Sequence, residues 1–177
     1  HETDSSFDEL DRSMTPGARL AAAIEVFADI AARRRPAADT LKDWGIGHRF
    51  AGSGDRAAIA GLVYDALRRR ASSAWIMGDD TPRAALLGML KRERGLDVDA
   101  IARLADGTGY APSALTEAES ARLASANFDG APPHVIGDYP EWLDAHFARA
   151  FGDERAEEGA APSSRALAPE RCGYAKA

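Results

Sequence analysis

The stretch GDRAAIAGLVYDALRRR, residues 54–70, constrains the fold of this chain more than any other segment. Its apolar residues recur at i, i+3, i+4, i+7 and i+8, which is the spacing of one wide face of an α-helix. Asp55 is placed to cap the N-terminus of such a helix, and Arg56 to act as a structural partner there. We therefore expect a long amphipathic helix from about Asp55 to Arg70, with a buried face made of Ile59, Leu62, Val63, Ala66 and Leu67.

Helix start signals recur along the rest of the chain. A threonine followed by proline, an N-cap residue and a favoured first helical residue, occurs at Thr15 and again at Thr81. Thr116 and Glu119 have the spacing of a capping box. No segment combines strand alternation with hairpin turns, so the predicted fold class is all-α. Besides the long helix, the expected helices cover about residues 16–35, 37–44, 72–77, 82–95, 97–105, 116–126 and 139–152.

Composition divides the chain into four parts. Residues 1–13 are acidic and polar and are expected to be a disordered extension. Residues 14–127 hold most of the expected helices and form the predicted helical domain. Residues 128–160 comprise a connector rich in proline and glycine, followed by the last helix. Residues 161–177 are rich in Ala, Pro, Ser and Arg and have no periodic apolar face, so a disordered tail is expected.

The net charge of −6 is distributed unevenly. Residues 14–95 carry a net charge of +5, whereas residues 1–13 and 96–177 carry −4 and −7. Because a ligand meets the local field and not the average of the chain, the acidic pI does not exclude a polyanionic partner. The segment 14–95 is therefore predicted to be a basic module within an acidic chain.

Several functional classes are disfavoured. No uncharged run approaches the roughly 20 apolar residues of a membrane span, and no secretory leader is evident, so a cytoplasmic protein without a membrane partner is expected. The single cysteine, Cys172, can form no internal disulfide, and we interpret it as an incidental thiol. The histidines are scattered, and no Cys/His cluster has zinc spacing, so no metal is expected.

Two arginine triplets, Arg33–Arg35 and Arg68–Arg70, are the main candidates for a functional site. Both end expected helices, where the helix dipole favours cations and where Asp29 and Asp65 could form local ion pairs. Taken alone, either triplet is therefore interpreted more simply as the solvated end of a helix than as a binding site. The surrounding basic segment favours RNA, because arginine forks onto phosphates and stacks on unpaired bases. The candidate RNA-binding residues are Arg33, Arg34, Arg35, His48, Arg49, Arg68, Arg69, Arg70, Lys91 and Arg92.

Aromatic residues are candidates for base stacking. His48 lies in a glycine-rich loop beside Arg49, where it could stack on a base or sense pH; a solvated loop residue is the interpretation we favour. The tryptophans Trp44, Trp75 and Trp142 could also serve as stacking platforms, but a mostly buried aromatic side chain on a helix is expected for each.

The stretch HRFAGSGDRAAIAGLVYDALRRR resembles the signature helix of the NusB-like RNA-binding domain. It is most similar to the version at the N-terminus of the RsmB/Sun family of RNA (cytosine-5) methyltransferases, with matches at Asp55-Arg56, Leu62-Val63-Tyr64 and Leu67-Arg68. YPEWLDAHFARAFG resembles the Pro-x-Trp-Leu helix that leads into the catalytic part of these enzymes. The resemblance covers about residues 14–160 and implies a NusB-like helical bundle that positions RNA, in particular small-subunit ribosomal RNA, for catalysis.

The sequence departs from that family after the last helix. A Rossmann-like domain for S-adenosylmethionine should follow, but residues 161–177 match none of its motifs. Cys172 does not stand in the motif of the family's nucleophile. No catalytic or cofactor-binding residue is therefore carried over, and the chain by itself is expected to bind no cofactor and to be catalytically silent.

Two other functions stay open at this stage. The chain could be a free-standing module like the NusB antitermination factors, which would act through a protein partner as well as RNA. The change of composition near Gly159 also leaves open a truncated gene product with no role of its own.

Overall fold

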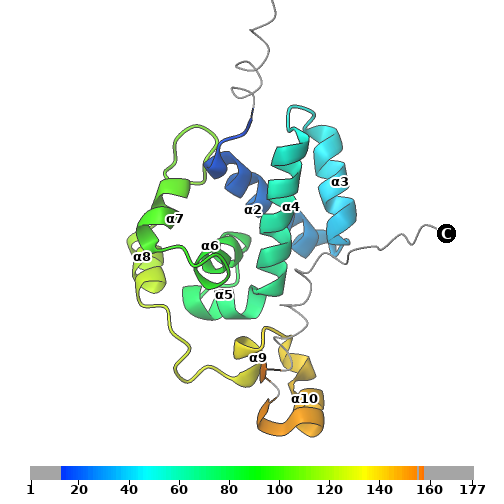
Figure 1. Cartoon of the computed structure of the whole chain (residues 1–177), viewed down its shortest axis with the longest axis vertical. Coiled ribbons are helices and arrows are strands. Elements are labelled where there is room, and N and C mark those ends of the chain that lie inside the picture. The colour runs from blue at the N-terminus through cyan, green and yellow to red at the C-terminus, as the bar shows by residue number, and fades with distance from the viewer. Residues whose placement is uncertain (1–12, 155, 158–177) are drawn as a thin grey trace, which may run out of the picture. The chain divides into compact units, whose positions relative to one another are not determined.

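A computed structural model describes residues 13–154, 156 and 157 (Figure 1). Every regular element in these residues is helical, and none of them forms a strand, which confirms the all-α prediction. The chain divides between Asn127 and Phe128 into two compact units. The predicted disorder of residues 1–13 and 161–177 lies almost wholly outside the described residues.

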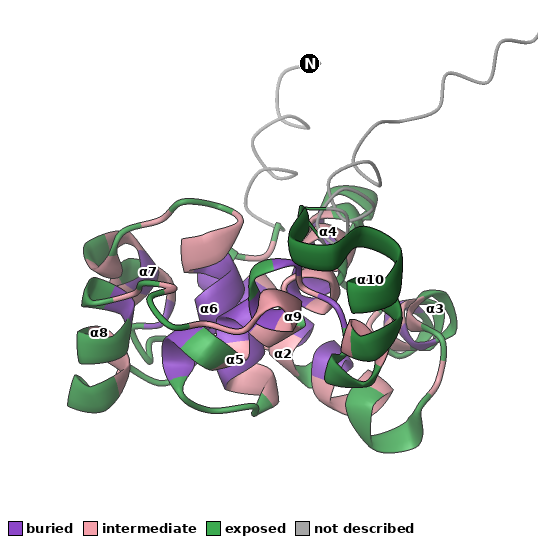
Figure 2. Ribbon diagram, turned by 90° about the horizontal axis from the view of Figure 1, so that it is seen from below, coloured by how far each residue is buried: buried purple, intermediate pink, exposed green. Residues whose placement is uncertain are grey.

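The first unit is built around helix α6, which runs from Pro82 to Arg92. Its consecutive residues from Ala84 to Leu90 are all buried, as the purple ribbon of Figure 2 shows, because neighbours pack on several of its faces. Helices α5, α2, α4 and α7 all contact α6. The other helices of this unit are α2 (Pro16–Arg33), α3 (Ala37–Gly47), α4 (Ser53–Arg68), α5 (Arg70–Met77), α7 (Val98–Leu104) and α8 (Glu117–Ala124).

Three helix starts confirm the expectations drawn from capping residues. The Thr15 hydroxyl accepts a hydrogen bond from the Ala18 amide at 3.1 Å, with Pro16 as the first helical residue. Thr81 caps α6 in the same way. At α8, Thr116 and Glu119 exchange the reciprocal bonds of a capping box. Each signal satisfies an amide at the helix start that would otherwise lack a partner.

The predicted helix over residues 55–70 is wrong at both ends. Helix α4 begins at Ser53 with Gly52 as its N-cap, and Asp55 is the third helical residue, whose carboxylate accepts from the Gly52 amide at 3.2 Å. The helix ends at Arg68, because the backbone of Arg69 leaves the helical range. Arg70 then begins α5, so the second arginine triplet spans two helices and the turn between them.

Other helix ends differ from the expected positions in smaller ways. Helix α3 continues through Gly45 to Gly47, beyond the expected end at Trp44. Arg56 donates to the carbonyls of Ala51 and Gly45, which confirms its structural role. Helices α6 and α8 end at Arg92 and Ala124, before the expected residues.

The second unit contains short elements. Helix α9 covers Pro133–Ile136, a 3₁₀ turn η1 covers Glu141–Leu143, α10 covers Asp144–Phe151, and a second 3₁₀ turn η2 covers Gly152–Glu154. The single helix expected over residues 139–152 is therefore wrong in its first part. Tyr139 is buried before the turn, its hydroxyl donates to the Asp144 carboxylate at 2.7 Å, and its ring lies 4.5 Å from that of Phe147.

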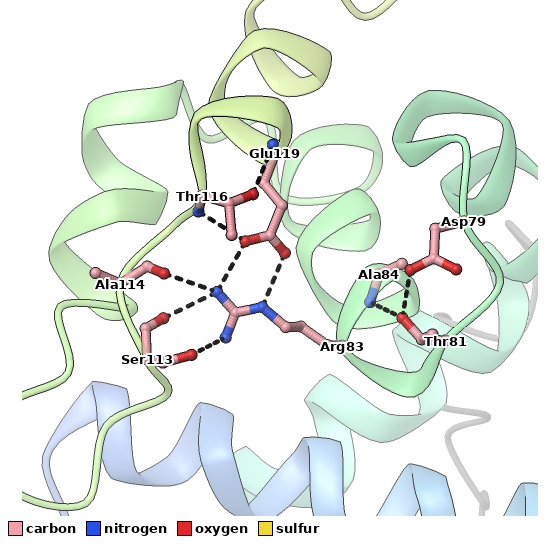
Figure 3. Close-up of polar contacts among 8 residues, drawn as sticks. All are labelled: Asp79, Thr81, Arg83, Ala84, Ser113, Ala114, Thr116 and Glu119. Atoms are coloured by element: carbon pink, nitrogen blue, oxygen red, sulfur yellow. Dashed lines mark hydrogen bonds and ion pairs between the residues drawn. The ribbon is translucent and has the colours of Figure 1, made fainter.

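An ion pair joins α6 to the loop and helix α8 that follow α7 (Figure 3). The Arg83 guanidinium donates to both carboxylate oxygens of Glu119, at 2.8 and 3.0 Å, and also to the Ser113 and Ala114 carbonyls. The hydrogen bond from Arg83 is the main reason that the pKa of Glu119 lies below its usual range. A carboxyl group of this kind stabilises the fold above its unfolded pKa, and this contribution is lost as the pH falls through its folded pKa.

We expect Glu119→Gln to lower the free energy of unfolding by about 1 kcal/mol at neutral pH, because glutamine retains the capping box but lacks the charge. The difference from the parent should shrink at low pH, as the pH falls through the lowered pKa of the folded carboxyl and the parent becomes protonated as well. Denaturant titrations at both pH values would measure it. Glu117→Gln, an exposed site in the same helical turn, is the control, and a pH-independent deficit in Glu119→Gln would contradict this account.

Candidate nucleic-acid interface

Buried carboxylates of the first unit bind many of its arginines. Asp55 accepts from the side chain of Arg19 at 2.8 and 2.9 Å. Asp65 pairs with both Arg68 and Arg94. These three arginines belong to the basic segment, but a ligand could bind them only in competition with the carboxylates.

The triplet Arg68–Arg70 is mostly engaged inside the fold. Arg69 pairs with Glu93 at 2.6 Å. The side chains of Arg68 and Arg69 are only 16% and 13% exposed. Arg70 is about half exposed, with its guanidinium 5.6 Å from the centre of the Phe27 ring and 3.6 Å from an Asp80 oxygen. Arg68 and Arg69 thus join the C-terminal ends of α4 and α6 and are poorly placed as primary RNA contacts.

The end of α6 lies beside this junction, because Glu93 and Arg94 bridge back to α4 and the α4–α5 turn. The structure therefore brings Lys91 and Arg92 to the same region as Arg68 and Arg69. Both Lys91 and Arg92 are half-buried. This proximity depends on pairs between residues far apart in the sequence, which no local pattern indicates.

The triplet Arg33–Arg35 forms the corner between α2 and α3, and it is more exposed than the triplet Arg68–Arg70. Arg33 pairs with Asp29 at 2.8 Å but stays largely exposed. Arg34 ends α2 in a left-handed conformation, with φ of 52°, and is exposed without an ion pair among the described residues. Arg35 pairs with Asp43 at 2.7 Å, and its hydrogen bond to that carboxylate raises the pKa of the guanidinium. This corner presents cations to solvent.

The loop at the other end of α3 holds an aromatic cluster. The rings of Trp44 and His48 stack with centroids 4.2 Å apart and planes within 8°. The His48 ring meets Phe50 edge-on at 5.8 Å. His48 Nδ1 lies 2.7 Å from the Trp44 carbonyl, which can only accept, so this nitrogen carries the proton. Between His48 and Phe50, Arg49 is exposed and has no ion pair in the part of the chain that is described.

The expected burial of the tryptophans is wrong for two of the three. Trp142 is 73% exposed in the second unit, and Trp75 is partly exposed, with its indole N–H donating to the Asn127 carbonyl at 3.1 Å. Trp44 is half-buried under His48. The favoured interpretation of His48 as a solvated loop residue is also wrong, because the ring is held between Trp44 and Phe50.

The candidate residues thus fall into two groups. One group is engaged at the α4–α6 junction. The other group lies at the two ends of α3 and on the helix itself, and we call it the α3 surface. Two of its members were not predicted from the sequence. Lys42 is exposed on α3 itself, and Phe50, 67% exposed, has no helical periodicity around it that could have indicated a role. The α3 surface comprises Arg33, Arg34, Arg35, Lys42, Trp44, His48, Arg49 and Phe50.

An apolar cavity of about 450 Å³ lies between α2, α4, α7 and the end of α6. Its two charged residues, Arg19 and Arg94, are already paired with Asp55 and Asp65, and the other side chains that line it are apolar.

Among the described residues, no group of three or more His, Cys, Asp or Glu side chains could hold a metal ion. Nor is any helix in this part of the chain long and apolar enough to cross a membrane.

Comparison with known proteins does not identify the chain. No family model, curated protein or solved structure matches it. The resemblance to the NusB-like domain therefore remains a prediction from the sequence.

Proposed function

We propose that this chain is an RNA-binding helical domain that positions RNA for a catalytic domain outside the described residues. The observation that carries the proposal is the division of its basic residues into those that are paired inside the fold and those that are exposed without an ion pair. Internal carboxylates bind Arg68, Arg69 and Arg94 at the α4–α6 junction. Among the exposed cations without an ion pair in the described residues, Arg34, Lys42 and Arg49 lie on the α3 surface, whereas Arg103 and Arg122 stand singly on α7 and α8.

The charge of the α3 surface suits a polyanion. Residues 33–50 contain five Lys and Arg against two Asp, a net charge of +3. Arg34, Lys42 and Arg49 are exposed and unpaired in the described part of the chain, so a phosphate can bind them without displacing a carboxylate. Such contacts release counterions and make binding sensitive to salt. Phosphate contacts fix the position of an RNA without reading its sequence, which is what a positioning domain requires.

In this proposal, a separate domain carries out the catalytic step. In the RsmB/Sun family that the sequence resembles, methyl transfer requires S-adenosylmethionine in a separate domain. The second unit would contact that domain through its exposed apolar side chains. Ile136, Trp142 and Phe151 are each at least 40% exposed, and exposed apolar groups of this size are typical of surfaces that bind another protein.

The exposed apolar side chains of the second unit also favour a second candidate function, a free-standing module that binds a protein partner together with RNA. Co-purification separates the two candidates. Recovery with ribosomal particles is expected for a methyltransferase-related domain, and recovery with transcription factors would favour the NusB-like module.

Titration of the full chain with fragments of small-subunit ribosomal RNA tests the proposal. We expect binding whose logarithm falls linearly with the logarithm of salt concentration. The double variant Arg34→Gln/Arg49→Gln should weaken binding roughly tenfold at low salt. It should also reduce the slope by about 1.4, because each phosphate of a single strand that a cation neutralises contributes about 0.7 to the slope.

Arg103→Gln is the matched control. Arg103 is an exposed arginine of α7, which Figures 1 and 2 place on the opposite side of the first unit from α3. This variant should bind RNA like the parent. Failure of the parent to bind at low salt, or an equal loss in the control, would refute the proposed interface.

A further inference from the structure

We propose that the aromatic cluster at the end of α3 is a stacking site for an unpaired RNA base, and that the α3 surface therefore binds single-stranded RNA in preference to duplex. The proposal rests on the proposed function and adds the class of RNA and the contact that selects it. It assigns Phe50 as the platform, with Arg49 beside it for the adjoining phosphate.

The Phe50 ring packs beside a restrained histidine. His48 is stacked on Trp44 and held by its Nδ1 hydrogen bond to the Trp44 carbonyl, so the ring cannot rotate freely. The His48 and Phe50 rings are in T-shaped contact, with centroids 5.8 Å apart and an interplanar angle of 77°. Phe50 is nevertheless 67% exposed. An aromatic ring that packs against a restrained neighbour and is still largely exposed can stack on a planar ligand with little loss of side-chain entropy.

The surroundings of Phe50 favour a nucleic-acid base as that ligand. Arg49 precedes it and is exposed and unpaired in the described residues. A ligand that presents a flat π-face and neighbouring negative charges fits this combination.

The preference for single strands follows from access to the base. In a duplex the faces of the bases are covered by their neighbours in the stack, and A-form helices are recognised mainly by shape and backbone. In a single strand the base face is available, and aromatic residues beside a basic surface are the usual means of binding it.

The test uses the full chain with a short unstructured RNA oligonucleotide and with its duplex. Phe50→Ala should lower the affinity for the single strand about 5- to 150-fold, the range for loss of one stacked base. The salt slope should stay unchanged, because no phosphate contact is removed. The affinity for the duplex should change little, so the preference for the single strand should fall.

Two further variants separate stacking from general hydrophobic contact. Phe50→Trp should retain the affinity, since it keeps an aromatic face, whereas Phe50→Leu should lose it almost as Phe50→Ala does. Tyr110→Ala is the matched control, because Tyr110 is an exposed aromatic of the loop after α7, 89% exposed. Circular dichroism should show all four variants folded, since neither side chain is buried.

The outcomes distinguish this inference from the proposed function. Salt-dependent binding that Phe50→Ala leaves unchanged, or that it weakens equally for single strand and duplex, would overturn the stacking site and leave the RNA-binding function standing. No binding of either RNA by the parent at low salt would overturn both.

Discussion

Replacing Gly88 with alanine is expected to destabilise the protein by about 2 kcal/mol or more, although alanine is the better helix former. A Cβ at this position would lie 2.6 Å from Ser73 Cβ and 2.7 Å from Ser73 Cα. Both atoms are close to the backbone of α5, so no side-chain rotation relieves the overlap. Helices α5 and α6 would have to separate, and α6 is the helix on which the unit is built.

Gly61→Ala provides the matched comparison. Gly61 lies within α4, but the nearest atom to its added Cβ is a terminal nitrogen of Arg94 at 3.6 Å, an ordinary contact. Here only helix propensity changes, and we expect a gain of about 0.5–1 kcal/mol. Denaturant titration of both variants measures the difference, and a Gly88→Ala variant as stable as Gly61→Ala would show that α5 and α6 are not closely packed at this point.

The elements that could be predicted from the sequence are those fixed by neighbouring residues. The starts at Thr15, Thr81 and Thr116 depend on a hydroxyl and an amide three residues apart. Such signals need no knowledge of the fold. The all-α class follows in the same way, because the helical spacing of apolar residues and the capping residues indicate the same result.

Contacts between distant residues could not be predicted. The break of the expected helix at Arg69 places α5 against α6, and this depends on the approach of Ser73 to Gly88. Asp55 is not the N-cap residue as expected but the third residue of α4, where its carboxylate accepts from the Gly52 amide and also binds Arg19, 36 residues away. Local propensity decided neither outcome; tertiary packing did.

The same limitation applies to the candidate site. A run of three arginines predicts a local excess of charge, but it does not reveal which members find carboxylates elsewhere. Arg69 meets Glu93, 24 residues away, while Arg34 is exposed to solvent. Phe50 stands in a loop with no periodic pattern, so its role on the α3 surface depended on its contact with His48.

Charge reversal of Arg68 and Arg69 to glutamate is expected to destabilise the first unit by about 4 kcal/mol or more, and not merely to weaken RNA binding. The first change places a carboxylate beside Asp65, whose side chain is only 9% exposed, and the second places one beside Glu93. Each removes a mostly buried ion pair and introduces a like-charge contact in its place. Thermal unfolding followed by circular dichroism measures the loss.

The comparison variant is Arg33→Glu/Arg34→Glu, the same charge change at exposed positions. It should unfold within about 1 kcal/mol of the parent, since exposed ion pairs contribute little, yet it should bind RNA much more weakly. If instead the Arg68/Arg69 reversal kept its stability while losing RNA affinity, those arginines would contact RNA directly and the internal pairs would be incidental. A reversal at Arg68 and Arg69 can therefore be interpreted as a binding defect only in a variant shown to be folded. The α3 surface offers the cleaner test, because its charges can be changed without removing a partner from a buried carboxylate.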